Sequence, residues 1–316
     1  MRIAITGGTG FVGRHLARAL ASEGHDVVLV ARGIDRRDPT VAKLHGARTV
    51  KAGVMEVETL RNAFAGCDAV AHCAGINRQI GAQTYPSVHV KGTANVITAA
   101  RAAGVRKIVM LSFLRARPAC GSPYHESKWA AEELVRKSGL DYTVVKASMT
   151  FGPGDHMLDH LSHLLYTLPV FVTVGLREKL VRPVAVQDVV QVLAAALIGG
   201  RLSRQTVAVL GPETLRLSEV AKRVGRLIGK HALVVPAPAA VNYVVAGVAE
   251  RVMRIPLASL AQVRMLDEGL VEPWGNVDPL PEDLVPRTPL SDEVLRAGLP
   301  TAGPFTRADL RIPGVI

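Results

Sequence analysis

Aromatic residues are scarce in this chain, where they make up 4% of 316 residues. The formal net charge is +11, but the basic residues are scattered and form no dense run interleaved with aromatic side chains. Nucleic-acid-binding surfaces usually combine those two features. We therefore exclude nucleic acid as a partner. The charge is interpreted as a solvated basic surface with an attraction for a phosphorylated ligand or anionic lipid.

Cysteine is also rare, and its three positions show neither a CxxC pair nor paired spacing: Cys67, Cys73 and Cys120. An odd number of unpaired cysteines is typical of a reducing compartment. The N-terminus opens directly on a strand, without a basic segment followed by an apolar one and a cleavage site. We expect a cytoplasmic protein without a signal peptide.

No apolar run is long enough to span a membrane. The longest, residues 232–249, is interrupted by Pro236, Pro238 and Asn242, which would break a spanning helix. We expect a short strand followed by an amphipathic helix over 240–253. Its apolar positions are Val241, Val244, Val245 and Val248. Such a stripe is typical of core packing, and contact with a membrane surface or a partner is the alternative.

Hydrophobic residues make up 48% of the chain and charged residues 21%, which suffices for a packed core. Strands that are apolar throughout alternate with helices in the first half: strands at 2–6, 26–31, 49–52, 69–73, 107–112 and 142–147, with helices at 12–23, 57–65, 89–103 and 124–138. This alternation predicts a Rossmann-type α/β fold, a doubly wound parallel sheet covered on both faces.

The rhythm changes after residue 150. We predict a dinucleotide-binding domain over 1–150 and a smaller, mainly helical substrate domain over 151–316. Segments near 179–186 and 206–210 are expected to return to the sheet.

The first predicted strand and helix are joined by a glycine-rich turn with Gly7, Gly10 and Gly13 in GxxGxxG spacing. Glycine allows a tight turn, a close approach of backbone to pyrophosphate, and close packing of helix on strand. The helix N-terminus then presents free N–H groups to the phosphates. The sequence therefore predicts a site for NAD(P).

Basic residues follow the second predicted strand, where an acidic residue would select NAD. Arg32 ends that strand, and Arg36 and Arg37 follow. A guanidinium can grip the 2′-phosphate of NADP through two hydrogen bonds. We expect NADP(H) to be preferred, with NAD(H) as the alternative.

A Y-x-x-x-K motif, Tyr124 and Lys128, begins a predicted helix, and Ser112 ends the strand before it. A phenol is a poor base unless a nearby ammonium lowers its pKa, which is the role expected of Lys128. Ser112 would orient the substrate oxygen during hydride transfer. These three residues are the predicted catalytic set.

With these motifs the chain resembles the short-chain dehydrogenase/reductase superfamily. Within it, the chain is most similar to atypical and extended members related to the dinucleotide-binding accessory subunit of respiratory complex I. The segments that carry the resemblance are TGGTGFVG at 6–13, HCAGIN at 72–77, HVKGTANV at 89–96, SPYHESK at 122–128, FGPGD at 151–155, RPVAVQDV at 182–189, and the late stretches at 256–271 and 286–299.

The resemblance implies a set of cofactor-binding positions: Gly7, Thr9, Gly10, Phe11, Val12, Gly13, Arg32, Val54, Cys73, Ala74, Gly75, Tyr124, Lys128, Ala147 and Met149. It also implies that Asn77 and His89 face the substrate. Three positions depart from the family pattern. Val54 lies where an Asp contacts adenine, His89 replaces an Asn of the proton relay, and Lys146-Ala147 replaces Arg-Pro.

Three functions follow as alternatives. The first is an oxidoreductase acting on an alcohol or carbonyl through Ser112, Tyr124 and Lys128. The second, favoured by the departures, is a non-catalytic accessory or assembly protein of a respiratory or quinone-related complex. The third is a sugar-nucleotide epimerase or dehydratase, for which the candidate diphosphate ligands are Arg177, Lys179 and Arg182.

Histidines recur at helical spacing in the second half of the chain, at His156, His160 and His163. No cysteine accompanies them, and an ordinary helix face has the same spacing, so we expect no metal site.

Overall fold

The computed structural model describes residues 1–33, 38–253, 258–300 and 303–305. Arg36 and Arg37 lie outside the described residues. The chain forms two compact units. Unit 1 contains Met1–Ser148, Val186–Val209 and Glu272–Arg287, and unit 2 contains Met149–Ala185, Leu210–Val271 and Thr288–Ile316.

Unit 1 is built on a seven-stranded sheet in the order β11-β6-β5-β4-β1-β2-β3, with every neighbouring pair parallel. The strands are β1 (Arg2–Thr6), β2 (Asp26–Ala31), β3 (Ala47–Lys51), β4 (Ala69–His72), β5 (Lys107–Phe113), β6 (Asp141–Ala147) and β11 (Gln205–Val209). The order is that of a Rossmann fold with one further strand. The predicted doubly wound parallel sheet is confirmed.

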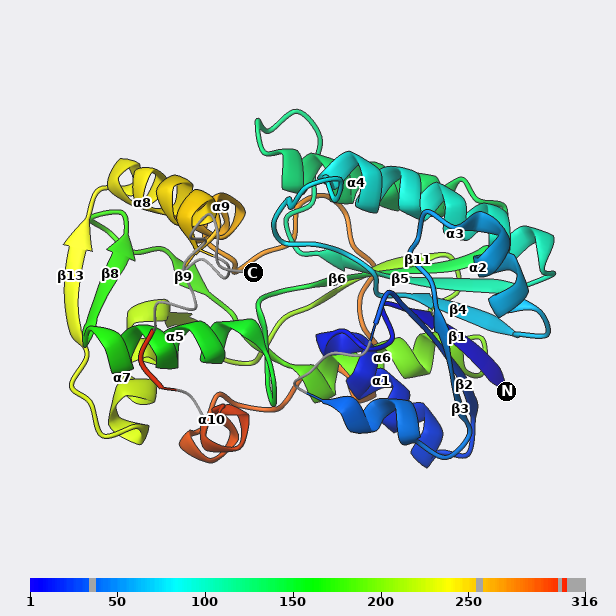
Figure 1. Ribbon diagram of the computed structural model, residues 1–316, viewed down its shortest axis with the longest axis horizontal. Helices are drawn as coiled ribbons and strands as arrows, with labels where there is room; N and C mark the ends of the chain where they lie inside the picture. Colours follow the sequence, from blue (N-terminus) through cyan, green and yellow to red (C-terminus); the bar gives the residue numbers. More distant parts are fainter. Residues whose placement is uncertain (34–37, 254–257, 301–302, 306–316) are drawn as a thin grey trace, which may run out of the picture. The chain divides into compact units, whose positions relative to one another are not determined.

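Helices cover both faces of this sheet (Figure 1). One layer contains α2 (Val57–Phe64), α3 (Gly92–Ala102) and α4 (Pro123–Arg136), and the other contains α1 (Phe11–Ser22) and α6 (Val186–Leu197). The central strands β1 and β4 are buried because helices lie on both sides, which explains why their sequences are apolar throughout. Leu60, Val96 and Ile108 belong to the core between the sheet and the first layer.

The strand order reverses between β1 and β4, which are neighbours in the sheet although β2 and β3 follow β1 in the chain. In open α/β sheets the ligand crevice lies at the carboxyl ends of the strands at this switch point. The glycine turn leaves β1 at that edge, and Cys73-Ala74 leave β4 there.

Unit 2 has a smaller core, in which α5 (His156–Thr167) and α7 (Leu217–Leu227) enclose Phe171. Phe171 belongs to β8 (Val170–Val174), which pairs in parallel with β13 (Leu233–Ala237). The remaining helices are α8 (Ala239–Val252), α9 (Leu260–Glu268) and α10 (Asp292–Gly298). Asn242 of α8 donates to the Thr173 carbonyl at 3.0 Å, which fixes α8 on β8.

The two segments expected to return to the main sheet behave differently. Residues 205–209 do return, as β11 beside β6. Residues 179–186 do not: β9 (Leu180–Val181) pairs with β12 (Leu215–Arg216), and β10 (Val184–Ala185) pairs with β7 (Thr150–Phe151). Pro183 separates the two short strands and cannot donate a ladder hydrogen bond, so no continuous strand forms.

Candidate functional site

The glycine turn after β1 is held by backbone hydrogen bonds and by lack of space for side chains. The Gly7 N–H donates to the Val30 carbonyl at 2.9 Å, and the Gly10 N–H to the Gly7 carbonyl at 2.8 Å. Gly7 has φ of 69°, and a Cβ there would lie 2.9 Å from the backbone of Ala74. A Cβ on Gly13 would overlap the Gly7 carbonyl oxygen. Glycine is required at both positions.

The N-terminus of α1 faces this turn without an acidic side chain or a side-chain cap. Its first N–H groups therefore remain available to an anion. Thr9 supports the turn by donating from Oγ1 to the Gly33 carbonyl at 2.7 Å. Phe11 and Val12 begin the helix, half-buried. This cradle of backbone donors fits a pyrophosphate.

Arg32 is exposed at the carboxyl end of β2 and makes no ion pair with the described carboxylates. Its side chain lies beside Gly53, where a Cβ would be 3.6 Å from Arg32 Cγ. The next residue, Val54, packs on Gly92, and its carbonyl accepts from Asn95 Nδ2 at 3.0 Å. Arg32 and Val54 thus lie at the carboxyl ends of the strands, as the glycine turn does.

His72, at the end of β4, has its tautomer fixed by two threonines. Thr93 donates its hydroxyl proton to the His89 carbonyl, so at 2.9 Å it must accept from His72 Nε2. The other ring nitrogen, Nδ1, then accepts from Thr6 Oγ1 at 2.7 Å. Burial, with Lys128 nearby, lowers the pKa of His72 to about 3. His72 is a neutral bridge between β1, β4 and α3.

His89 makes a second bridge of the same kind. Ser127 donates to the Tyr124 carbonyl at 2.9 Å, so His89 Nδ1 donates to Ser127 Oγ at 2.8 Å. His89 Nε2 accepts from the Ile76 N–H at 3.1 Å. Burial, with Lys128 nearby, lowers the pKa of His89 to about 2. His89 thus fastens the loop after β4 to the first turn of α4.

His89 lies in the segment predicted to start a helix at residue 89. The structure instead has a π-helical turn, Pro86–Lys91, ahead of α3. The wider turn carries the buried ring of His89. Single π-turns inside helices often accompany functional sites.

Tyr124 lies in α4 inside an aromatic cage and is 7% exposed. Its ring meets those of Tyr85 and Phe113 at 5.5 Å and that of His89 at 5.7 Å. Its hydroxyl makes no hydrogen bond to the described residues. Burial, and then Tyr85, raises the pKa of Tyr124 above its ordinary value. This differs from the expectation that Lys128 lowers it, and the phenol is protonated at neutral pH.

Lys128 lies one turn after Tyr124 and is also 7% exposed. Its Nζ donates to the Leu111 carbonyl at 2.9 Å, and a Cβ on Gly75 would lie 3.8 Å from it. Burial lowers the pKa of Lys128 to about 8, against the opposite effect of Glu132 and Cys73. The ammonium therefore lies beside Gly75. Gly75 belongs to the loop after β4, and the preceding residue of that loop, Ala74, contacts Gly7.

Ser112 does not join this group. Its hydroxyl donates to Glu132 Oε1 at 2.5 Å, and Glu132 also binds Arg136 at 2.9 Å and Lys146 at 3.4 Å. All of Ser112, Glu132 and Lys146 are buried. The expected role of orienting a substrate oxygen conflicts with this bond, because the single hydroxyl proton already serves the carboxylate.

The other predicted positions are distributed as follows. Asn77 is exposed, and its carbonyl accepts from Tyr85 Oη at 2.9 Å. Burial raises the pKa of the Cys73 thiol to about 12, which favours the protonated thiol at neutral pH. Ala147 is buried at the end of β6 in unit 1. Met149 belongs to unit 2.

Several residues of this cluster were not foreseen from the sequence: Tyr85, Thr93, Ser127 and Glu132. Glu132 had a signal, since it lies four residues after Lys128 on the same helix face. Tyr85 had none, because only the fold brings it to Tyr124.

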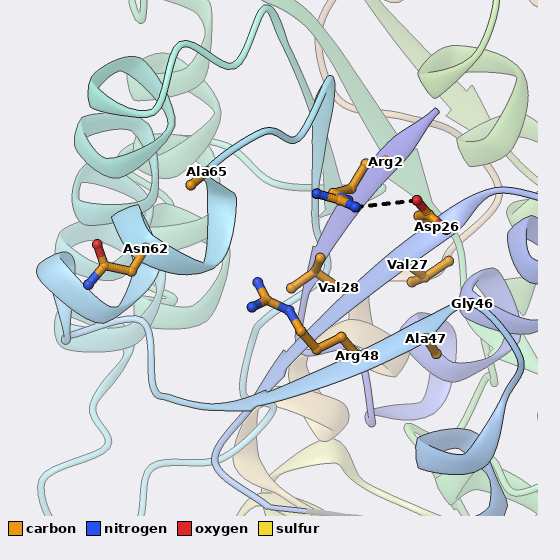
Figure 2. Close-up of a pocket in the computed structure, with 9 residues that line it drawn as sticks. All are labelled: Arg2, Asp26, Val27, Val28, Gly46, Ala47, Arg48, Asn62 and Ala65. Carbon is orange, nitrogen blue, oxygen red and sulfur yellow. Dashed lines mark ion pairs between the residues drawn. The ribbon is translucent and has the colours of Figure 1, made fainter.

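A cavity of about 410 Å³ lies at the amino ends of β1, β2 and β3, opposite the carboxyl ends where the glycine turn lies. Figure 2 shows Arg2 and Arg48, from β1 and β3, extending toward the α2 segment, with Arg2 paired to Asp26 at 3.5 Å. None of the predicted cofactor or catalytic residues lines this cavity. It is therefore separate from the candidate dinucleotide site.

Part of the histidine row in unit 2 does converge. His156, Asp159 and His160 on α5 offer ligand atoms within 4.8 Å of one another. His163 instead bonds the Gly303 carbonyl through Nδ1 at 2.6 Å. Two imidazoles and a carboxylate are donors that zinc accepts, so α5 is where a divalent ion would find three ligands in the described part of the chain. That no metal binds stays a prediction.

The two neutral histidines predict a loss of stability in acid. An unfolded histidine takes up a proton near pH 6.5, whereas folded His72 and His89 do so near pH 3 and 2. Between these values the unfolded chain binds more protons, so stability falls as pH drops below about 6.5. At pH 5 each of the two histidines should lower the free energy of unfolding by about 2 kcal/mol.

Urea unfolding of wild type and His89→Gln at pH 7 and pH 5 checks this. The variant should lose about 2 kcal/mol less than wild type on acidification, whereas the exposed control His45→Gln should behave as wild type. An equal loss in all three proteins would contradict the neutral His89.

Comparison with known proteins agrees with the geometry. Residues 7–154 match a family described as NAD(P)H-binding. The chain is 27% identical over 277 residues to the mitochondrial NADH-ubiquinone oxidoreductase 40 kDa subunit of Neurospora crassa, covering 85% of this chain and 72% of that protein. It is 28% identical over 247 residues to the photosystem II assembly factor Ycf39 of Synechocystis, covering 76% and 72%.

Other relatives are much longer. The matches to mycobacterial proteins, at 28% identity over 226 residues, cover 72% of this chain but 23% of their length.

Among solved structures, the UDP-glucuronic acid 4-epimerase of Bacillus cereus in complex with UDP-glucuronic acid and NAD is 15% identical. It superposes with a TM-score of 0.71 over 94% of this chain and 98% of that one. At that identity the likeness shows the fold alone. None of the helices in the described part of the chain combines the length and hydrophobicity needed to cross a membrane. Over residues 7–154 the chain is thus similar to NAD(P)H-binding proteins, and its fold is the one found in that epimerase.

Proposed function

We propose that the protein is an NADP(H)-dependent oxidoreductase that reduces a carbonyl compound. The observation that carries this proposal is the convergence of three segments at the carboxyl ends of the unit 1 strands: the glycine turn, the loop after β4, and α4. Gly7 contacts Ala74, Gly75 lies beside Lys128, and Tyr124 precedes Lys128 by one turn. In the proposed division, unit 1 binds the dinucleotide and unit 2 is the substrate domain.

Bound NADPH would supply the hydride. The backbone N–H groups at the start of α1 and the turn at Gly7–Gly13 would hold its pyrophosphate, and Lys128 would hold the nicotinamide ribose. Gly75 leaves room for that contact because it has no side chain.

Tyr124 would donate a proton from its hydroxyl to the carbonyl oxygen of the substrate. Burial keeps the phenol protonated, which is the state that a proton donor needs when a carbonyl is reduced. The aromatic rings around Tyr124 would exclude water from the transferred proton. His89 and Ser127 would hold the first turn of α4 in place through the bonds described above.

The cofactor preference is tested by titrating nucleotide-free protein with NADPH and NADH, using nicotinamide fluorescence. Arg32→Ala should weaken NADPH binding about tenfold, because a charge-assisted hydrogen bond to the 2′-phosphate contributes about 1.5 kcal/mol or more. NADH binding should not change, since NADH lacks that phosphate.

The matched control is Arg101→Ala, which removes an exposed arginine of α3. It should leave both affinities at the wild-type value. If wild type binds NADH as tightly as NADPH, the preference for NADP is wrong. If it binds neither, the oxidoreductase proposal is abandoned as well.

A non-catalytic accessory or assembly role is the second candidate. The bond from Ser112 to Glu132 favours it, because it withdraws a hydroxyl that the catalytic set needs. Two relatives, a complex I subunit and a photosystem II assembly factor, also support it. A protein that binds NADPH tightly and turns over none of a broad panel of carbonyl compounds would fit this role.

The epimerase alternative has less support than the accessory role. Of its candidate diphosphate ligands, Arg182 donates from Nε to the Gly211 carbonyl at 3.0 Å, so this guanidinium already makes a structural hydrogen bond within unit 2.

The cysteines bear on the cellular location. Cys67, Cys73 and Cys120 are free thiols, which supports a reducing compartment such as the cytoplasm.

A further inference from the structure

The outward ridge of α8 is made of valine. The exposed members, with their exposed fractions, are Val241 48%, Val244 67%, Val245 54%, Val248 53% and Val252 46%. A helix advances by about 100° per residue, and on that spacing the five side chains fall within a sector of about 100°. This stripe was expected to pack on a core, and that interpretation is wrong: the buried positions of α8 are Ala246, Gly247 and Ala249.

Three polar residues of α8, Asn242, Tyr243 and Glu250, are half-buried and form hydrogen bonds with neighbouring segments. Asn242 donates to the Thr173 carbonyl at 3.0 Å, and Tyr243 to Asp267 at 3.4 Å. Glu250 accepts from the Leu260 N–H at 3.0 Å. A surface helix normally has the opposite arrangement, with polar residues outward and apolar ones inward. The outward valines are therefore not the by-product of an apolar helix.

The apolar surface continues onto the neighbouring strands. Val172 of β8 and Val235 of β13 are register partners and are 41% and 39% exposed. Leu233, two residues before Val235 on the same face, is 63% exposed. Val174, two residues after Val172, is buried against Ala246 of α8. The helix thus covers one end of this strand face and leaves the rest open.

The fully exposed charged side chains around this surface are basic. The exposed charged or titratable residues on the flanking segments 175–180, 229–232 and 250–252 are Arg177, Lys179, Lys230, His231 and Arg251. The nearby carboxylates are only partly exposed and are engaged: Glu178 accepts from the Ser218 N–H, and Glu268 pairs with Arg264 at 2.6 Å. A strip of aliphatic side chains bordered by cations complements a surface of lipid tails under anionic headgroups.

We propose that this valine face, made of the five valines of α8 with Val172, Leu233 and Val235, docks on an anionic phospholipid membrane. The helix is about 21 Å long, shorter than the roughly 30 Å hydrocarbon core, so α8 would lie in the interface. Protein–protein interfaces rely on aromatic and arginine anchors at their centre. The valine face has no aromatic member and is bordered by exposed Lys179, Lys230 and Arg251, and this basic border favours anionic lipid over a protein partner.

Co-sedimentation of the full chain with vesicles tests the proposal. One set of vesicles is phosphatidylcholine alone and the other is phosphatidylcholine with phosphatidylglycerol. We expect binding to the anionic vesicles that weakens as salt rises. Val244→Ser/Val248→Ser should lower the partition coefficient at least about tenfold, and Lys230→Gln/Arg251→Gln should lower it several-fold.

The matched control is Val285→Ser, which removes an apolar side chain of unit 1 that is 46% exposed. It should bind vesicles as wild type does. All variants should keep wild-type circular dichroism and NADPH affinity, so that failure of the docking surface and failure of the dinucleotide site are distinguishable.

Absence of binding to anionic vesicles, or equal binding by the double valine variant, would overturn the proposal. So would light scattering that shows a dimer which Val244→Ser/Val248→Ser dissociates, because the occupant of the face would then be a second copy of the chain.

Discussion

Gly13→Ala is expected to weaken dinucleotide binding by at least about 100-fold, which corresponds to about 2.7 kcal/mol or more. The added methyl group would overlap the Gly7 carbonyl oxygen and lie 3.0 Å from Gly8 Cα. Since all of these atoms belong to backbone, no side-chain rotation relieves the clash. The turn must open, which moves the Gly7 carbonyl and the N–H groups at the start of α1 away from the pyrophosphate.

The control is Gly303→Ala in unit 2, where a Cβ meets no atom within 4 Å. It should bind NADPH as wild type does. Gly13→Ala should also lower the melting temperature, because close packing of α1 on the turn is lost. Nicotinamide fluorescence gives the affinity and circular dichroism reports whether the sheet remains. A folded Gly13→Ala protein with wild-type affinity would contradict the assignment of this turn to the pyrophosphate.

The unit 1 fold was predictable because its signals are local. Strands β1 and β2 are buried on both faces and therefore read as unbroken apolar runs, and the glycine turn depends on residues adjacent in the chain. The strand order then follows from right-handed crossovers. Unit 2 has weaker signals, since its strands are short and Pro183 divides one of them. The pairing of β8 with β13 joins segments about sixty residues apart and has no local signature.

The sequence predicted which residues belong to the candidate site better than it predicted their pKa values and hydrogen bonds. Spacing placed Tyr124 and Lys128 on one helix face, as observed. It did not reveal that Tyr85 and Phe113 enclose Tyr124, or that burial, and then Tyr85, raises the pKa of Tyr124. It also did not reveal that Glu132 takes the hydroxyl of Ser112. Both effects depend on burial and on contacts between distant segments, which spacing along one element cannot report.

The valine stripe of α8 illustrates the same limit. A helical repeat of apolar residues identifies an amphipathic face but not its direction. Here the inward side obtains its contacts from small residues, Ala246 and Ala249, and from bonded polar side chains. The direction of the stripe was therefore decided by the partners of Asn242 and Tyr243, which lie on β8 and α9.

Tyr124→Phe is expected to lower the turnover of a carbonyl substrate by about 10²- to 10⁴-fold, the range typical of losing a positioned general acid. The phenol is the only described hydroxyl in the aromatic cage without a hydrogen-bond partner, so it is the group free to meet a substrate oxygen. NADPH affinity should stay at the wild-type value, because the removed oxygen is not part of the phosphate cradle. The measurement is NADPH consumption over a panel of aldehydes and ketones, with the nucleotide titration alongside.

The pH profile gives an independent check on the same site. Lys128 is the neighbour of Tyr124 that loses its charge nearest to neutrality, with a pKa of about 8. Catalytic efficiency should fall as pH rises through about 8, because the ammonium that holds the ribose is lost while Tyr124 remains protonated. Tyr85→Phe is the matched control: it removes a neighbouring phenol whose hydroxyl bonds the Asn77 carbonyl and should retain most of the activity. If Tyr124→Phe keeps wild-type turnover while Tyr85→Phe loses it, the proton donor is Tyr85, and the role assigned to Tyr124 is wrong.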